Sequence, residues 1–116
     1  MLRKLFAGLQ NSLAGLAHAY RRDASFRMEA WTAPAFLIFG YFASPLSPSE
    51  FLFLLLSFTL IMMAELINTA FERALERLHP ERHELIGATK DIASAAVFIA
   101  VCFALVVISV ISWNRF

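Results

Sequence analysis

The stretch that decides the fold reads FLFLLLSFTLIMMA from Phe51 to Ala64 and continues as ELINTAFERALE from Glu65 to Glu76. An acid thus follows an apolar run directly. Steps of three, four and four residues return to one face of an α-helix. The polar residues that share this face are Glu65, Asn68, Glu72 and Glu76. Because a carboxylate at the end of an apolar membrane segment is costly without a partner or a function, the stretch predicts polar chemistry where a membrane meets water.

The composition indicates a membrane protein with a single domain, residues 1–116. The 116 residues are 59% hydrophobic and 16% charged, whereas soluble domains have roughly 45–50% apolar and about 25% charged residues. Cys102 is the one cysteine and lies in an apolar run, so an intramolecular disulfide is excluded and no cysteine metal cluster is expected. No nucleic-acid partner is expected.

Hydrophobic periodicity divides the chain into an N-terminal amphipathic helix and three apolar spans. The first helix, about 2–27, is amphipathic, which suits a helix that lies on a membrane surface or one that packs on the rest of the protein. One helix can do both. The spans cover about 29–47, 50–70 and 92–113, and the first is short for a hydrocarbon layer of about 30 Å. We therefore predict an all-α membrane protein with a surface helix and three transmembrane helices.

The distribution of lysine and arginine predicts the orientation. Basic residues precede the first span and lie between the second and third, whereas residues 44–49 contain none and the C-terminal tail has only Arg115. By the positive-inside rule, the N-terminus and the second loop are cytoplasmic and the C-terminus is outside.

The remaining polar candidates all collect on the predicted cytoplasmic side. Several carboxylates close to one lysine and one asparagine suit Mg²⁺, which prefers oxygen ligands and shares them with phosphates. Simpler explanations exist for part of the set: a solvated helix end would also place Glu72 and Glu76 four residues apart, and Lys90-Asp91 would also cap a helix. The residue pattern alone predicts a functional acidic site at the inner face of a membrane.

Three motifs resemble the signature of the prokaryotic diacylglycerol kinase family, which comprises small integral membrane lipid kinases. They are ELINTAFE from Glu65 to Glu72, HEL from His83 to Leu85, and GATKDIASAAV from Gly87 to Val97. A further match is DASFRME from Asp23 to Glu29. The resemblance covers nearly the whole chain in order and with compatible spacing.

The resemblance implies a role for individual residues. Glu65 is similar to the general base that accepts the proton of the lipid hydroxyl, and Asn68 matches a polar catalytic position. Asp23 and Glu72 match metal ligands, although the family usually has glutamate where Asp23 stands.

The resemblance also implies two sets of substrate-binding residues. Those for ATP are Lys4, Asn11, Asp23, Glu72, Glu76, Glu81, Arg82, His83, Lys90 and Asp91. Those for the lipid are Lys4, Phe26, Arg27, Glu29, Glu65 and Ser94. Glu76 replaces a usual aspartate.

The expected function is thus an ATP- and Mg²⁺-dependent kinase of the bacterial inner membrane that converts diacylglycerol to phosphatidic acid. Three helices are too few to enclose both substrates, and the resemblance implies a homotrimer with sites shared between subunits. Two alternatives remain open: an undecaprenol kinase, which belongs to the same family, and a non-enzymatic three-span assembly or pore subunit.

Overall fold

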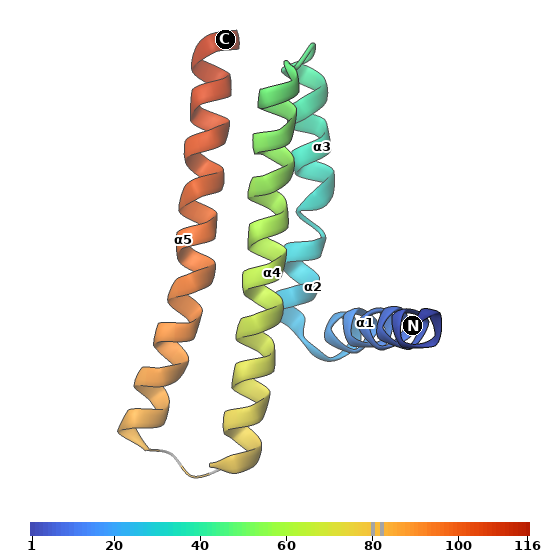
Figure 1. Cartoon of the computed structure of the whole chain (residues 1–116). Helices are drawn as coiled ribbons and strands as arrows, with labels where there is room; N and C mark the ends of the chain where they lie inside the picture. Colours follow the sequence, from blue (N-terminus) through green and yellow to red (C-terminus); the bar gives the residue numbers. More distant parts are fainter. Residues whose placement is uncertain (80, 82) are drawn as a thin grey trace.

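The computed structural model describes residues 1–79, 81 and 83–116, and every regular element in them is a helix. The helices are α1 (Leu2–Arg22), α2 (Ala24–Ala30), α3 (Ala33–Phe42), α4 (Pro48–Leu78) and α5 (Glu84–Arg115). The antiparallel helices α4 and α5 form the axis of the molecule, α3 lies beside α4, and α1 runs across their direction (Figure 1). The prediction of an all-α fold is confirmed.

Helices α4 and α5 are long and apolar enough to cross a membrane. They contain 31 and 32 residues, with mean hydropathies of 2.1 and 2.9 in their most apolar windows. Only 22% of each window is buried within the chain, so neither is the core helix of a soluble domain. Large apolar side chains such as Leu52, Phe98 and Val106 point outward instead. An apolar surface of this extent needs a lipid or protein environment, and the two helices have the length and composition to cross a membrane.

The best-packed part of the molecule is the half in which α3, α4 and the end of α5 meet. Leu54, Val107 and Ile111 are buried there with Ala43. Nearer the middle, Ile61 of α4 packs against two alanines of α5, Ala100 and Ala104. Small side chains at these two positions let the helices approach closely.

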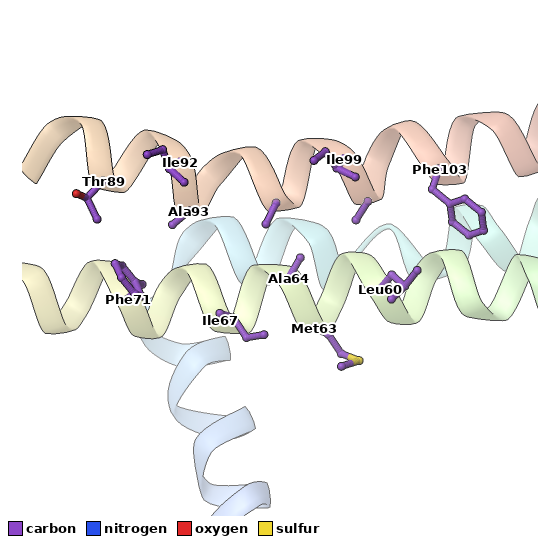
Figure 2. Close-up of a pocket in the computed structure, with 12 residues that line it drawn as sticks. Leu60, Met63, Ala64, Ile67, Phe71, Thr89, Ile92, Ala93, Ile99 and Phe103 are labelled. Atoms are coloured by element: carbon purple, nitrogen blue, oxygen red, sulfur yellow. The ribbon is translucent and has the colours of Figure 1, made fainter.

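Toward the turn between them, α4 and α5 are separated by an apolar groove of about 700 Å³ (Figure 2). Phe71 and Ala64 of α4 point across it toward Thr89 and Ala93 of α5, whereas Met63 points away. The groove's lining contains no carboxylate. The helix pair is thus closed at one end and open at the other.

The first predicted span differs from a single helix over 29–47. The chain forms α2, a turn at Trp31 and Thr32, and then α3, which ends at Phe42. The surface helix expected over 2–27 likewise ends at Arg22, because Asp23 is extended and begins α2. The second and third predicted spans lie within the longer helices α4 and α5.

Although α2 and α3 are short, together they follow α4 over much of its length. The start of α2 lies beside Arg73, which donates to the carbonyl of Arg22. Near the end of α3, the side chain of Leu54 lies 3.6 Å from the position that a Cβ would take at Gly40. These two levels are 19 residues apart on α4, or about 28 Å at about 1.5 Å per residue.

Candidate active site

The polar stripe of α4 passes from the interior of the bundle to its surface. Glu65 is 5% exposed and Asn68 is 8% exposed, whereas Glu72 is half-buried and Glu76 is exposed. The Nδ2 of Asn68 donates to Oε1 of Glu72 over 3.5 Å. The Oδ1 of Asn68 is buried without a hydrogen-bond partner among the described residues. The amide of Asn68 therefore joins the half-buried carboxylate of Glu72 on the polar stripe of α4.

Four carboxylates converge at this level, and we call them the acidic cluster: Asp23, Glu29, Glu65 and Glu72. Glu29, Asp23 and Glu72 each lie close enough to repel a negative charge on Glu65. The cluster draws on the α1–α2 joint, α2 and α4, which are far apart in the sequence but packed together. Like charges gathered in a partly buried region favour a bound cation.

Asp23 has a structural role at the joint between α1 and α2. It begins α2, and its Oδ1 accepts a hydrogen bond of 2.7 Å from the backbone N–H of Phe26. This is the usual N-cap arrangement, in which a short acidic side chain satisfies a free N–H group. Phe26 is buried at 3% exposure, so the joint is fixed from both sides.

A second polar region lies at the turn between α4 and α5, and we call it the polar hollow. Its volume is about 590 Å³, and its lining residues are Glu76, His79, Glu81, His83, Glu84, Ile86, Gly87 and Lys90. Lys90 pairs with Glu76 across the helices, with Nζ 3.8 Å from Oε1. Nδ1 of His83 accepts from the N–H of Leu85 and thereby caps α5. The polar hollow thus holds charges of both signs.

The structure brings most of the predicted site residues into these two regions. The acidic cluster contains Asp23, Glu29, Glu65 and Glu72 beside Asn68, and the polar hollow contains Glu76, Glu81, His83 and Lys90. Glu72 and Glu76 are one turn apart on α4 and connect the two regions.

The other predicted residues that the structure describes line neither region. Lys4 and Asn11 are exposed on α1, and Asp91 and Ser94 are exposed on α5. The remaining two are Phe26, which is buried, and Arg27, which donates to the carbonyl of Tyr20 over 2.7 Å. Arg82 lies outside the described residues.

The oxygens of the acidic cluster and of Asn68 are of the type that Mg²⁺ prefers. Among the described residues, no three Asp, Glu, His or Cys side chains come close enough to hold a metal ion by themselves. Mg²⁺ is commonly bound by one or two carboxylates, with phosphates and waters completing its ligands. Asp23, Glu72 and the unpaired Oδ1 of Asn68 supply oxygens of that kind.

Two residues beside the acidic cluster were not predicted from the sequence. Thr69 is 8% exposed, and its Oγ1 has no hydrogen-bond partner among the described residues. In the sequence, Arg73 is one of the basic residues between the second and third predicted spans, and only its charge was used. In the structure, its Nη2 donates to the carbonyl of Arg22 over 2.7 Å. The one available signal for Arg73 was its place directly after Glu72.

Comparison with known proteins supplies the family. The sequence pattern of the family described as prokaryotic diacylglycerol kinase matches residues 10–112. The diacylglycerol kinase of Haemophilus influenzae is 37% identical over 101 residues, which cover 87% of this chain and 85% of that protein. The diacylglycerol kinase of Escherichia coli strain K12 is 32% identical over 105 residues, or 90% and 85% of the two chains.

A relative with a different named substrate also matches. The undecaprenol kinase of Bacillus subtilis is 30% identical over 96 residues, which cover 83% of this chain and 77% of that protein. Its match is shorter and less similar than those of the two diacylglycerol kinases. The chain therefore belongs to the prokaryotic diacylglycerol kinase family, a family of kinases.

Proposed function

We propose that this protein is an ATP-dependent lipid kinase that phosphorylates diacylglycerol to phosphatidic acid at the cytoplasmic face of the inner membrane. The observation that carries the proposal is the convergence of Asp23, Glu29 and Glu72 on the buried Glu65, in a chain of this family. The hydroxyl of a diacylglycerol lies at the depth of the lipid headgroups, and a water-soluble nucleotide reaches the membrane only at that depth. The two substrates can therefore come together where a membrane helix changes from apolar to polar. That is the level of Glu65 on α4.

In the proposed reaction, Glu65 is the general base. The lipid hydroxyl oxygen forms a bond to the γ-phosphorus of ATP, the bond to the bridging oxygen of ADP breaks, and Glu65 accepts the hydroxyl proton. Phosphoryl transfer depends mainly on positioning and on neutralising charge. Asn68 holds Glu72 in place through its amide, and its free Oδ1 is available to a ligand.

Asp23 and Glu72 are the proposed ligands of Mg²⁺. When bound, the ion neutralises charge on the phosphates. The proposed residues at the nucleotide are Glu76, Glu81, His83 and Lys90, supported by their shared hollow, together with Asp91, Lys4, Asn11 and Arg82 from the family resemblance. The proposed lipid-binding residues are Phe26, Arg27, Glu29 and Ser94, together with Lys4 and Glu65.

We further propose three membrane crossings, with α2 and α3 together forming the first. The segment follows α4 for about 28 Å, close to the thickness of a hydrocarbon layer of about 30 Å. Because the α2–α3 segment starts near Arg73, α1 lies at the same end of α4 as the basic residues between α4 and α5. The positive-inside rule then makes this end cytoplasmic and the C-terminus external.

A homotrimer with sites shared between subunits is also proposed. Large apolar side chains remain exposed on α4 and α5 in the single chain, and a second copy is one partner able to cover them. Asp91 and Ser94 line neither polar region of their own chain, which supports a role toward a neighbouring subunit.

The decisive experiment offers each lipid in turn to the purified protein in mixed micelles with γ-labelled ATP. We expect label in phosphatidic acid, and a higher kcat/KM for diacylglycerol than for undecaprenol. Preference for the polyprenol would favour the second candidate, undecaprenol kinase, which the relative from Bacillus subtilis supports. Transfer to neither lipid would refute the proposed function.

A further inference from the structure

The C-terminal end of α1 is closed by two guanidinium groups. The last carbonyls of a helix have no partners within it and are favourable places for cations. At the end of α1, the carbonyl of Ala19 accepts from the N–H of Asp23 over 2.9 Å. The three carbonyls that follow accept from arginine side chains: Arg27 reaches Tyr20 at 2.7 Å and Arg21 at 3.4 Å, and Arg73 reaches Arg22 at 2.7 Å.

These two arginines differ in where they come from. Arg27 belongs to α2, within seven residues of its acceptors, and so closes the joint locally. Arg73 belongs to α4 and lies 51 residues from Arg22. Among the described residues, its hydrogen bond is the one side-chain hydrogen bond that ties α1 or α2 to α4. Arg73 therefore fixes the joint relative to the rest of the molecule.

The hydrogen bond joins two pairs of neighbouring residues. Arg73 directly follows Glu72, and Arg22 directly precedes Asp23. The contact thus holds the two proposed metal ligands at one level of the bundle. It also opposes a repulsive force, because the carboxylates of Glu29 and Asp23 repel a negative charge on Glu65 of α4.

We infer that Arg73 is a positioning residue that sets Asp23 against Glu72 for the binding of a divalent cation. The inference rests on the proposed function, in which Asp23 and Glu72 are the ligands of Mg²⁺. Arg73 acts through the backbone carbonyl of Arg22 and touches neither substrate nor the reacting atoms. Losing a group that supports a metal ligand commonly weakens metal binding by about 10- to 100-fold.

The test compares Arg73→Met, Arg73→Lys and a matched control, Arg77→Met. Methionine keeps much of the side-chain length without a donor, and lysine keeps the charge and can still donate. Arg77 is exposed one turn further along α4, so its replacement removes the same charge. We expect Arg73→Met to raise the Mg²⁺ concentration for half-maximal activity by about tenfold, with the KM for lipid unchanged. Arg73→Lys should recover most of this change, and Arg77→Met should resemble the wild type.

Two further measurements separate positioning from other roles. Binding of Mn²⁺ with adenylyl-imidodiphosphate, followed by electron paramagnetic resonance, should show the same loss of affinity without turnover. In an Asp23→Asn background, which keeps the helix cap, Arg73→Met should change the Mn²⁺ affinity by no more than about twofold. If Arg73→Met does not fold, Arg73→Gln takes its place in each comparison.

An unchanged metal affinity in Arg73→Met, an equal loss in Arg77→Met, or a full effect in the Asp23→Asn background would overturn the inference. The last result would instead indicate direct contact with the nucleotide. A wild type that binds no Mn²⁺ would also overturn it. A wild type that binds Mn²⁺ but phosphorylates neither lipid would refute the proposed function alone.

Discussion

Asn68 and Thr69 each bury a side-chain oxygen that has no hydrogen-bond partner among the described residues. Such a group costs about 1–3 kcal/mol of stability unless a ligand satisfies it. Two other threonines show how such a hydroxyl is usually satisfied in a helix. Thr59 of α4 and Thr89 of α5 each donate to the backbone carbonyl four residues earlier, at 2.8 Å. The absence of this bond at Thr69, beside Asn68 and one turn from Glu65, is typical of a binding site rather than of a helix optimised for stability.

The stripe of Glu65, Asn68 and Glu72 was predictable from spacing, because helical periodicity alone places these residues on one face. Thr69 was not, since a threonine in an apolar helix ordinarily bonds to its own backbone. Asp23 and Glu29 were found as members of a motif. Their position against Glu65 depends on tertiary packing of α2 on α4, which no local pattern contains.

At Glu65, replacement by glutamine should remove the base while leaving the shape of the side chain. We expect kcat to fall by about 10²- to 10⁴-fold, the range that general-base catalysis supplies, with the helix content unchanged. The measurement is initial-rate phosphorylation of diacylglycerol in mixed micelles, beside circular dichroism of the same sample. Near-normal activity would refute the assignment.

The matched control for Glu65→Gln is Glu50→Gln. Glu50 lies at the opposite end of α4, where it completes the N-terminal cap and pairs with Arg115 at 2.6 Å. Glutamine is also suited to this cap position. A kcat close to that of the wild type is expected, and an equal loss in both variants would show a general effect of removing an acid from α4.

At Glu72, replacement by glutamine should raise the Mg²⁺ requirement. The amide removes the negative charge that a hard cation prefers, while the contact with Asn68 at 3.5 Å can persist. The Mg²⁺ concentration for half-maximal activity should rise by at least about tenfold, the lower end of the loss seen even for groups that only support a ligand. A Mg²⁺ titration at saturating ATP checks this, and an unchanged curve would argue against ligation.

At the scale of elements, α4 and α5 were predictable because long apolar runs and end signals agree. Ser47 and Glu50 form a capping box at the start of α4, and His83 caps α5. The division of the first span into α2 and α3 was less accessible. The first span is apolar without interruption from Ala33 to Ala43. The turn at Trp31 and Thr32 contains neither glycine nor proline, and the nearest residue that disfavours a helix is Pro34.

The cap of α4 gives a prediction about stability. In Ser47→Ala, the side-chain acceptor of the N–H of Glu50, at 3.1 Å, is lost. The free energy of unfolding should fall by about 1 kcal/mol, with kcat unchanged, because the cap lies far along α4 from Glu65. Reversible unfolding by dodecyl sulfate in mixed micelles measures this. Ser49→Ala, two residues further into the helix, serves as the control, and an equal loss there would contradict the capping explanation.

At the scale of the whole molecule, the two polar regions follow one another along the polar stripe of α4, near the same end of that helix. The acidic cluster faces α2, whereas the polar hollow faces the start of α5. The sequence predicted the four carboxylates of the acidic cluster and four residues of the polar hollow, Glu76, Glu81, His83 and Lys90. It could not separate the two regions, because positions on a single stripe do not reveal which neighbouring helix each side chain meets. The apolar groove between α4 and α5 is a third, separate feature, with no carboxylate in its lining.

The number of crossings is the property of the whole molecule that a labelling experiment decides most directly. If α2 and α3 cross the membrane, Ser12 of α1 and Ser44 after α3 lie on opposite faces of the membrane. If they do not cross it, both residues lie on the same face.

Single cysteines are introduced as Ser12→Cys and Ser44→Cys in a Cys102→Ala background and treated with a membrane-impermeant maleimide. We expect Ser44→Cys to react in spheroplasts and Ser12→Cys to react only in inverted vesicles. In the wild-type protein, Cys102 lies inside the apolar part of α5 and should react neither in spheroplasts nor in inverted vesicles. Reaction of both introduced cysteines from the same face would leave α4 and α5 as the two crossings. The joint between α1 and α2 would then have to bring Asp23 close to Glu65 without a third crossing.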